Sequence, residues 1–527
     1  METKIITIDQ ENLDHKLMQE AGDLIAAGEL VAFPTETVYG LGGDALDPEA
    51  SKKIYSAKGR PSDNPLIVHI SDFSDLERVA KTVPEDARKL SDAFWPGPLT
   101  MIVEKGDAVP YATTGGMDTV AVRMPNHPIA LDLIRRSGCL IAAPSANTSG
   151  RPSPTEAAHV AEDLSGKIAM IIDGGPVGIG IESTIIDLTE DTPMVLRPGY
   201  ITPQMLSKVL GKEVIIDPGI IAADDTRKPK APGMKYKHYA PKAKVVIVNA
   251  DKKKYEEFVN AQKGAFALCF DDDEVTIPKI TFGRENDDLS QAKELFDALR
   301  ELDEMGAKKV YARIPHKDGV GMAVYNRLIR AAAFDIIDLT KPFTVGLTGP
   351  TGAGKSYVCE IFRQKGFKII DCDKIAHELT AKNAPILAEL ADEFGEDVVK
   401  NGELDRKLLA SRAFDKKEHT KKLNSILHPA IAEKCKEEAQ GLTVLDASQL
   451  FEANMQNDCY KVIGVLADED VRIKRIIARD NITEQQAKLR MSAQFDNDYF
   501  IDNCDYIIYN NGEDIAAQTD NILEVIL

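Results

Sequence analysis

Residues 343–356 read FTVGLTGPTGAGKS, an apolar run followed at once by a glycine-rich turn. From Gly349 to Ser356 the letters fit the phosphate-loop pattern G-x-x-x-x-G-K-[ST] at every position. The apolar run predicts a buried strand, and residues 356–365 predict the helix that follows the loop. Glycines let successive backbone amides turn toward one anion, and the helix N-terminus adds positive potential there. This stretch therefore predicts an α/β domain with a parallel sheet that binds a nucleoside triphosphate.

The side chains of the loop predict how the nucleotide is held. Lys355 should bridge the outer phosphates of ATP, and the hydroxyl of Ser356 should ligate Mg²⁺. The remainder of the expected cradle consists of Gly352, Ala353, Gly354 and Tyr357.

Residues 341–527 have the length of a small kinase, and they lack the N-K-x-D sequence by which GTPases read guanine. The segment FKIIDCD predicts a second strand that leads into Asp371 and Asp373. A carboxylate there can orient or deprotonate an attacking hydroxyl; Asp373 is the stronger candidate, because Asp371 fits a helix cap equally well. Residues 470–494 predict a helical lid whose arginines could close onto the transferred phosphate: Arg472, Arg475, Arg479 and Arg490.

The motifs of residues 343–527 resemble the dephospho-CoA kinase family: the phosphate loop, IIDCDKIAHEL (369–379), LHPAI (427–431), LDASQLFE (445–452) and DYIIYNNG (505–512). That resemblance implies transfer of the γ-phosphoryl group of ATP to the ribose 3′-hydroxyl of dephospho-CoA, the last step of coenzyme A synthesis. It makes Asp373 the catalytic carboxylate, places Arg475 and Arg479 in the lid, Asn510 near the adenine, and His428 at the acceptor. Ser448-Gln449 replace the family's usual Pro-Leu, so a nucleotide sensor that phosphorylates no acceptor is the alternative.

Residues 1–216 alternate short apolar runs with amphipathic segments, which predicts an α/β domain around a central twisted sheet. The expected strands are residues 30–33, 99–103, 120–122, 140–142, 170–172 and 184–188. The expected helices are residues 13–27, 50–58, 84–94, 128–137 and 155–164. Several loops after strands are rich in Gly, Pro, Ser and Thr, as small-ligand sites at strand ends are.

Cations and hydroxyls fall on these loops. Lys58 and Arg60 follow a predicted helix, and Arg123 ends a predicted strand. Fixed arginines with hydroxyls at strand ends suit a phosphate-bearing ligand together with a smaller polar partner. The residues alone name no reaction, and cations at the end of a helix also complement its dipole.

Seven motifs in order resemble the YrdC-like threonylcarbamoyl-AMP synthase family: FPTETVYGLG, KGRPSDNPLIVH, FWPGPLT, VAVRMPNH, APSANTSG, ESTIID and LRPG. The resemblance implies that L-threonine, bicarbonate and ATP give threonylcarbamoyl-AMP and pyrophosphate, for the tRNA threonylcarbamoyl transferase machinery. It implies ATP binding by Lys58, Arg60, Asn64, Thr119, Ser145, Asn147, Ser153 and Arg197, of which Lys58 and Arg60 are also catalytic. It implies threonine binding by Thr35, Thr37, His69, Arg123 and Ser183.

Residues 217–242 contain several prolines and little apolar periodicity, which by composition predicts a linker. By resemblance to longer members of the synthase family, this segment joins two domains and folds over the active site, with Tyr236 and His238 capping the pocket. Residues 243–340 predict a small, Rossmann-like β/α domain. The expected organisation is a synthase domain (1–216), a joining segment (217–242), a small domain (243–340) and a P-loop kinase domain (341–527).

The chain has 527 residues and a formal net charge of −20. Residues 341–527 carry 24 basic and 32 acidic residues, a net of −8, which leaves −12 for residues 1–340. Neither part offers the clustered positive charge of a nucleic-acid surface, which weakens the alternative that the first half is an RNA-binding module.

No apolar run reaches membrane-span length, and the first residues, METKIITIDQENLD, do not resemble a signal peptide. The chain has seven cysteines and no C-x-x-C pair, which suits free thiols. We therefore expect a cytoplasmic bifunctional enzyme that binds neither membranes nor nucleic acids directly.

Overall fold

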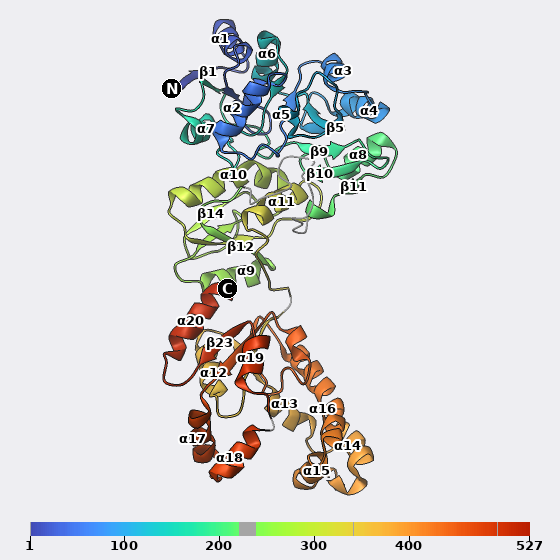
Figure 1. Cartoon of the computed structure of the whole chain (residues 1–527), viewed down its shortest axis with the longest axis vertical. Coiled ribbons are helices and arrows are strands. Elements are labelled where there is room, and N and C mark those ends of the chain that lie inside the picture. Colours follow the sequence, from blue (N-terminus) through green and yellow to red (C-terminus); the bar gives the residue numbers. More distant parts are fainter. Residues whose placement is uncertain (1, 221–238, 341, 493, 527) are drawn as a thin grey trace. The chain divides into compact units, whose positions relative to one another are not determined.

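The computed structural model describes residues 2–220, 239–340, 342–492 and 494–526 (Figure 1). The chain divides into two compact units, Met1–Ile336 and Ile337–Leu527. The first unit holds an 11-stranded sheet, and a five-stranded sheet follows it along the chain; the second unit holds another five-stranded sheet and a two-stranded hairpin. Mixed helices and strands in every part confirm the α/β class expected from the sequence.

The large sheet of the first unit is mixed, with the order β1-β8-β2-β3-β7-β4-β6-β5-β9-β10-β11. Its strands are β1 (Lys4–Thr7), β2 (Val31–Phe33), β3 (Gly40–Asp44), β4 (Ile67–His69), β5 (Leu99–Glu104), β6 (Thr119–Arg123), β7 (Ile141–Ala142), β8 (Met170–Asp173), β9 (Thr184–Asp187), β10 (Met194–Arg197) and β11 (Ile215–Ile216). Its helices are α1 (His15–Ala26), α2 (Pro48–Lys58), α3 (Leu76–Val79), α4 (Glu85–Phe94), α5 (Tyr111–Thr114), α6 (Pro128–Ser137), α7 (Ala157–Leu164) and α8 (Pro203–Leu210).

Most pairings within this sheet join short strands, and register determines which side chains meet. Strands β4 and β6 run parallel, so that His69 pairs with Arg123 where both strands end. Strand β3 reads GLGGD because it is crowded by its neighbours: a Cβ on Gly42 would lie 2.8 Å from both Ile141 and Phe33. A side chain larger than hydrogen at this position would push β2 and β7 apart.

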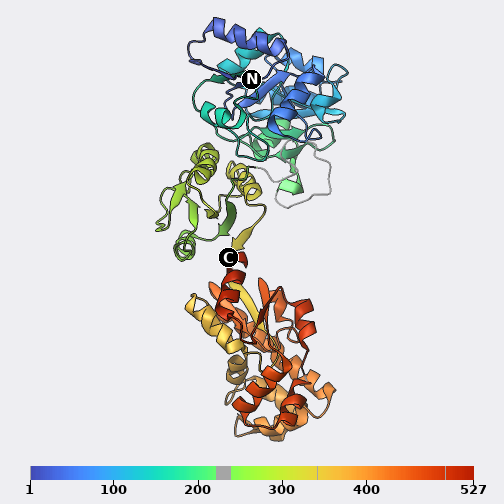
Figure 2. The same ribbon diagram turned by 60° about the vertical axis from the view of Figure 1, so that its left-hand side comes forward.

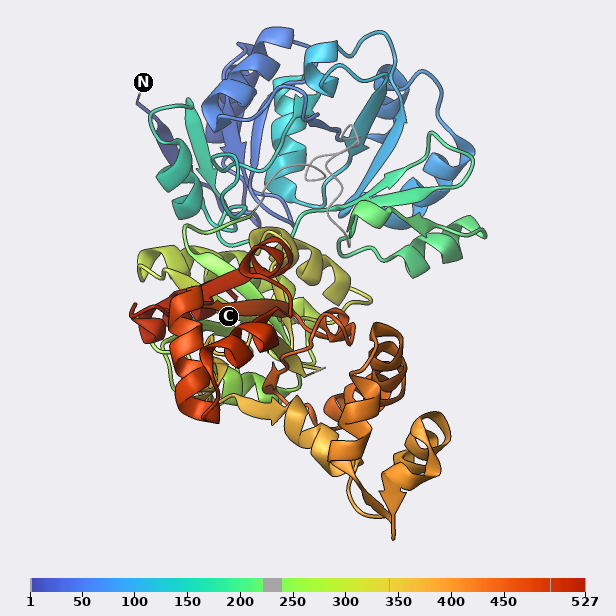
Figure 3. The ribbon, with the colours of Figure 1, turned by 60° about the horizontal axis from the view of Figure 1, so that its bottom comes forward.

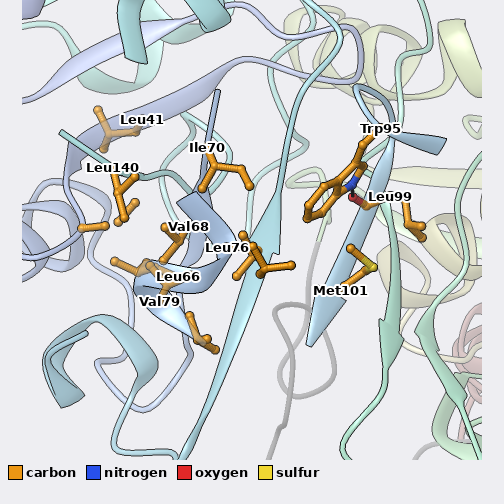
Figure 4. Packing of buried hydrophobic residues seen from close by; sticks show 14 of the residues in the cluster. Leu41, Leu66, Val68, Ile70, Leu76, Val79, Trp95, Leu99, Met101 and Leu140 are labelled. Carbon is orange, nitrogen blue, oxygen red and sulfur yellow. Dashed lines mark hydrogen bonds between the residues drawn. The ribbon is translucent and has the colours of Figure 1, made fainter. Parts of the chain in front are cut away.

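Buried apolar side chains from β3, β4, β5 and the helices around them form the main core of the first unit (Figure 4). Leu41, Val68 and Leu140 are fully or almost fully buried in it. The indole of Trp95 packs at the same core and donates a hydrogen bond from Nε1 to the carbonyl of Leu99 at 2.7 Å. The polar edge of the ring is thereby satisfied inside an apolar environment.

The second sheet belongs to a small β/α domain with the strand order β14-β13-β15-β12-β16 (Figure 2). Its strands are β12 (Lys244–Asn249), β13 (Phe266–Cys269), β14 (Lys279–Thr281), β15 (Lys309–Arg313) and β16 (Ile336–Asp338), and its helices are α9 (Lys252–Asn260), α10 (Asp288–Glu304) and α11 (Gly321–Ala331). Pairings of β12 with β15, β15 with β13 and β13 with β14 are all parallel, as a Rossmann-like domain requires. We call this part the small domain.

The second unit is built on a fully parallel sheet, β18-β21-β17-β22-β23. Its strands are β17 (Phe343–Thr348), β18 (Lys368–Asp371), β21 (Leu442–Asp446), β22 (Lys461–Leu466) and β23 (Tyr506–Tyr509), and β19 (Val399–Lys400) pairs with β20 (Glu403–Leu404) in a separate hairpin. Its helices are α12 (Lys355–Gln364), α13 (Cys372–Leu379), α14 (Ile386–Phe394), α15 (Arg406–Ala413), α16 (Lys417–Glu438), α17 (Glu469–Asp480), α18 (Glu484–Met491), α19 (Asn497–Asn503) and α20 (Ile515–Ile526).

Two groups of helices extend from this sheet. Helices α14, α15 and α16 (orange) gather around a small apolar cluster of their own (Figures 1 and 3). Helices α17 and α18 form the hairpin that residues 470–494 predicted, except that residue 493 lies outside the described residues. Most of the predicted joining segment, residues 217–242, also lies outside the described residues, which do not include residues 221–238. Among the described residues, no helix combines the length and apolar character needed to cross a membrane.

We predict that Leu41→Ala lowers the free energy of unfolding of the first unit by about 2–5 kcal/mol, because the side chain is fully buried and leaves a cavity. Leu289→Ala, at a position 50% exposed, should change it by less than about 0.5 kcal/mol. Trp95 is the single tryptophan of the chain, so urea unfolding followed by its fluorescence reports on this unit. Equal destabilisation by both substitutions would contradict the assigned core.

Candidate active sites

The first unit contains a cavity at the ends of several strands. It is lined by Thr35, Val38, Gly40, Lys58, Arg60, Ile67, His69, Arg123, Ala143, Pro144, Ser145, Asn147, Ser149, Gly150, Arg151, Ser153, Glu182, Ser183, Arg197 and Tyr239. Ten of the residues that the sequence predicted for ATP or threonine are among these. Side chains from positions 35 to 197 thus converge because strands β2, β4, β6, β7 and β10 all deliver residues to the same place.

Lys58 is the last residue of α2 and is 2% exposed. Gly59 ends the helix in the left-handed conformation, φ 61°, and turns the chain so that Arg60 also faces the cavity. The ammonium of Lys58 donates to the carbonyls of Ser145 and Asn147. Burial, with the charge of Arg60 nearby, holds the pKa of Lys58 well below its ordinary value. An anion in the cavity would favour the charged lysine.

The half-buried Arg60 and the buried Arg197 are the other two cations on the expected ATP side. The guanidinium of Arg60 donates to the carbonyls of Asn64 at 3.2 Å and Pro65 at 3.0 Å. Arg197 ends β10 and donates from Nε to the carbonyl of Ser183 at 3.0 Å and from Nη2 to its hydroxyl at 3.1 Å. Burial lowers the pKa of both arginines to about 10, which still leaves them charged at neutral pH.

Arg123 forms the centre of the expected threonine side. Its Nη1 donates to the hydroxyl of Thr37 at 2.9 Å, and its Nη2 lies 2.7 Å from a carboxylate oxygen of Glu36. Thr37 is therefore not at the cavity wall but behind it, where it orients Arg123. His69 lies beside Arg123 on the neighbouring strand, and burial and that positive charge lower its pKa to about 3. His69 is thus a neutral imidazole at physiological pH.

Several cavity residues escaped the sequence analysis. Glu182 stood within a quoted motif but was assigned no role, and Arg151 and Tyr239 were not considered. Glu182 accepts a hydrogen bond from the hydroxyl of Ser153 at 2.6 Å. Burial alone would raise the pKa of Glu182, but Arg327 and Arg197 outweigh it and lower the pKa. Arg327 comes from the small domain, and no local pattern near residue 327 predicts that contact.

Besides Thr37, two further predicted positions among the described residues, Thr119 and Asn64, do not line the cavity. Thr119 begins β6, at the opposite end of the strand from Arg123, and the structure does not bring it to the ATP side. Asn64 is buried and contributes a carbonyl that Arg60 contacts. Tyr236 and His238 lie outside the described residues.

In the second unit the phosphate loop has the expected context, between β17 and α12. Gly354 caps α12 with φ 98°, and a Cβ there would lie 2.2 Å from the side-chain nitrogen of Asn510, so only glycine fits. Asn510 donates from that nitrogen to the carbonyl of Ala353 at 2.7 Å, and Arg475 donates to the Asn510 side chain at 3.0 Å. These contacts hold the backbone of the phosphate loop in place.

Lys355 opens α12, and its ammonium reaches the carbonyl of Gly349 at 3.4 Å and the hydroxyl of Ser448 at 3.3 Å. Ser448 is one of the two residues that depart from the family pattern. The other, Gln449, lies 3.2 Å from Nε2 of His428 through its side-chain oxygen. Ser448 therefore contacts Lys355, and Gln449 contacts His428, both of which the sequence analysis assigned to the site.

Carboxylates gather near the phosphate loop. Asp371 accepts a hydrogen bond from the backbone of Lys374 and is the N-cap of α13, which confirms the helix-cap interpretation. Asp373 lies in the first turn of that helix and is exposed. Asp446 ends β21, and burial raises its pKa although Lys355 opposes that shift. Among the described residues, no cluster of three or more His, Cys, Asp or Glu side chains could hold a metal ion unaided.

The lid hairpin is tied to the phosphate loop at its base. Arg472 donates to the carbonyl of Thr351 at 3.0 Å, and the side chain of Gln494 accepts from the backbone of Thr351 at 2.8 Å. Arg479 forms two hydrogen bonds of 2.8 Å with the neighbouring Asp480, to which Arg490 also pairs. Arg479 would have to leave Asp480 to reach a phosphate.

His69 predicts a specific acid sensitivity. Its pKa is about 3 in the folded chain against an ordinary value of 6.5, so between these values the unfolded chain binds the proton and the folded chain does not. Stability should therefore fall as the pH drops below about 6.5, by at most about 1.4 kcal/mol per pH unit from this group. His69→Gln should flatten that loss in urea titrations at pH 6.5 to 4.5. His15→Gln, at an exposed position, is the control; equal acid profiles for wild type and His69→Gln would contradict the assignment.

Comparison with protein families gives three matches in order along the chain. Residues 23–199 match a family described as "Telomere recombination", residues 201–333 match "Threonylcarbamoyl-AMP synthase, C-terminal domain", and residues 343–515 match "Dephospho-CoA kinase".

Two curated proteins and one solved structure give the same division. The threonylcarbamoyl-AMP synthase of Pyrococcus abyssi is 48% identical over 347 residues, which are 64% of this chain and 99% of that protein. The dephospho-CoA kinase of Corynebacterium glutamicum is 36% identical over 193 residues, 35% of this chain and 96% of that protein. The crystal structure of P. abyssi Sua5 complexed with L-threonine matches 64% of this chain and 99% of its own, with a TM-score of 0.61 and 48% identity. The chain therefore belongs to both families, as a threonylcarbamoyl-AMP synthase joined to a dephospho-CoA kinase.

Proposed function

We propose that the two parts of this chain catalyse two separate ATP-dependent reactions. The first part converts L-threonine, bicarbonate and ATP to threonylcarbamoyl-AMP and pyrophosphate. The second part transfers the γ-phosphoryl group of ATP to the 3′-hydroxyl of dephospho-CoA. The observation that carries this proposal is that each part builds its own anion site: a cavity with three buried cations and the half-buried Arg60 in one, a phosphate loop in the other.

In the first reaction the threonine amine takes up CO2 or bicarbonate as a carbamate, whose oxygen attacks the α-phosphorus and displaces pyrophosphate. The carbamate is already an anion, so the protein mainly positions reactants and neutralises charge. Lys58, Arg60 and Arg197 would bind the phosphates of ATP. Arg123 would bind the threonine carboxylate, with Thr37 and Glu36 holding its guanidinium in place. The neutral His69 would contact threonine without adding charge. A tRNA-modifying transferase would consume the product.

In the second reaction Lys355 and the loop amides would bind the outer phosphates, and Asp373 would orient and deprotonate the acceptor hydroxyl. His428 would contact the acceptor, held through Gln449. Arg475 supports the loop through Asn510, and Arg479 would reach the transferred group once the lid closes.

Magnesium fits this second site. Ser356 offers a hydroxyl at the start of α12, and Asp446 offers a half-buried carboxylate whose pKa is raised by burial although Lys355 opposes that shift. Oxygen ligands of this kind are those that Mg²⁺ prefers. When bound, Mg²⁺ would neutralise charge on the phosphates of ATP.

We predict that Lys355→Ala and Arg60→Ala separate the two activities. Lys355→Ala should lower phosphorylation of dephospho-CoA by at least about 100-fold, because the outer phosphates lose their cation, and leave the synthase unchanged. Arg60→Ala should abolish pyrophosphate release that requires threonine and bicarbonate, and leave the kinase unchanged. Both activities are measured in one preparation, so each variant is the control for the other. Loss of both activities in either variant would contradict two independent sites.

We further predict that Asp373→Asn lowers the kcat of dephospho-CoA phosphorylation by about 10²- to 10⁴-fold and changes the KM for ATP little, because the amide cannot accept the hydroxyl proton. Asp392→Asn, an exposed carboxylate on α14, is the matched control. Steady-state kinetics with a coupled ADP assay measure both constants. A kcat near that of wild type would remove Asp373 from the mechanism. Absence of acceptor phosphorylation in the wild type would favour the nucleotide sensor instead.

A further inference from the structure

Buried arginines of the small domain reach into the wall of the synthase cavity. Arg327, on α11, has no exposed side-chain surface. Its Nε donates to a carboxylate oxygen of Glu182 at 3.0 Å, and its Nη1 donates to the carbonyl of Pro198 at 2.5 Å. Its Nη2 donates to the carbonyl of Glu182 at 3.3 Å. All three nitrogens therefore contact residues outside the small domain, and Nη1 also donates to the side-chain oxygen of the neighbouring Asn326 at 3.4 Å.

The targets of Arg327 are the sequence neighbours of two cavity residues. Glu182 precedes Ser183, and Pro198 follows Arg197, while Ser183 and Arg197 are themselves joined by two hydrogen bonds. One guanidinium thus holds both sides of the Ser183–Arg197 pair. The two segments are also closely packed, since a Cβ on Gly199 would lie 2.5 Å from the backbone nitrogen of Thr184.

A second arginine of the small domain makes a similar contact with another loop of the cavity. Arg300, on α10, donates to the carbonyl of Pro152 at 2.6 Å and to the carboxylate of Asp163 at 3.1 Å. Pro152 precedes Ser153, whose hydroxyl donates to Glu182. The small domain therefore holds the Ser153–Glu182 contact from both ends.

Charge explains why arginine is needed here. Glu182 is a buried carboxylate inside a cavity that is expected to receive the phosphates of ATP, where an uncompensated negative charge would repel them. Arg327 forms an ion pair with it and leaves the cation of Arg197 available to the ligand. The rigid, planar fork of a guanidinium places its donors on three separate nitrogens, so that it reaches the Glu182 carboxylate and the carbonyls of Glu182 and Pro198 at once, whereas a lysine offers its donors from a single nitrogen.

We infer that Arg327 is a positioning residue of the synthase: from the small domain it fixes Glu182 and Pro198, and thereby the geometry of Ser183 and Arg197 at the ATP-binding wall. The small domain is then a required half of the synthase site, with no ligand of its own needed to explain it. This inference rests on the synthase activity proposed above.

The test compares two double variants, each of which removes one buried ion pair. Arg327→Met/Glu182→Gln removes the pair that crosses to the cavity wall. Arg313→Met/Asp273→Asn removes a buried pair that lies within the small domain. Because both partners of each pair become neutral, neither partner is left behind as an unpaired buried charge. Arg327→Lys is added as the conservative variant.

We expect Arg327→Met/Glu182→Gln to lower the synthase kcat/KM for ATP at least tenfold at a temperature where thermal unfolding shows the variant to be folded. Arg327→Lys should recover part of that loss, and Arg313→Met/Asp273→Asn should stay within twofold of wild type. Dephospho-CoA phosphorylation by the same preparations should be unchanged. Synthase kinetics within twofold of wild type for Arg327→Met/Glu182→Gln, or equal losses in the two double variants, would overturn the inference. A wild-type chain without threonine-dependent pyrophosphate release would instead overturn the proposed function, and the inference with it.

Discussion

Lys58, Arg123 and Arg197 bring three positive charges into the interior of the first unit, and the half-buried Arg60 adds a fourth at the same cavity; each must be compensated. Carbonyl oxygens of the strand-end loops satisfy Lys58 and Arg60, and side-chain hydroxyls and a carboxylate satisfy the two strand arginines. Burial still depresses the pKa of Lys58, Arg60 and Arg197, so holding these positive charges together in the cavity costs free energy. An anionic ligand removes that cost. The fold of the large sheet can be understood as the scaffold that keeps these cations together, although the chain as a whole carries a net charge of −20.

The second unit also forms an anion site, but it does so with backbone amides instead of buried cationic side chains. Its anion site is made by loop amides at the N-terminus of α12, and cationic side chains approach from α12 and the lid. The cost here is conformational, since Gly354 must adopt a positive φ and has no room for a side chain beside Asn510. The two anion sites of the chain are therefore built in unrelated ways: both are expected to bind ATP, but they share no residues. Neither product is a substrate of the other half, so the chemistry itself requires no transfer between them.

Local sequence predicted what depends on local structure. The phosphate loop, the strand end that carries Arg123 and the α17–α18 hairpin follow from short patterns, and the structure has them there. The three-residue strand that ends at His69 was not among the expected strands. Resemblance to known families added most of the cavity residues. The sequence did not predict the roles of residues that depend on contacts between distant segments of the chain. Thr119 and Arg123 share one strand but lie at its opposite ends, and the contact of Arg327 with Glu182 spans 145 residues. Composition alone also predicted a linker over residues 217–242, yet Tyr239 within this segment lines the cavity.

The number of ATP sites per chain tests most directly whether an acidic chain has built two separate anion sites. Isothermal titration calorimetry of the full chain with a non-hydrolysable ATP analogue, Mg²⁺ and threonine should give two binding events per chain. Lys355→Ala and Arg60→Ala should each leave one, and the double variant none. A single site in the wild type, or loss of both sites on either single substitution, would contradict two independent sites.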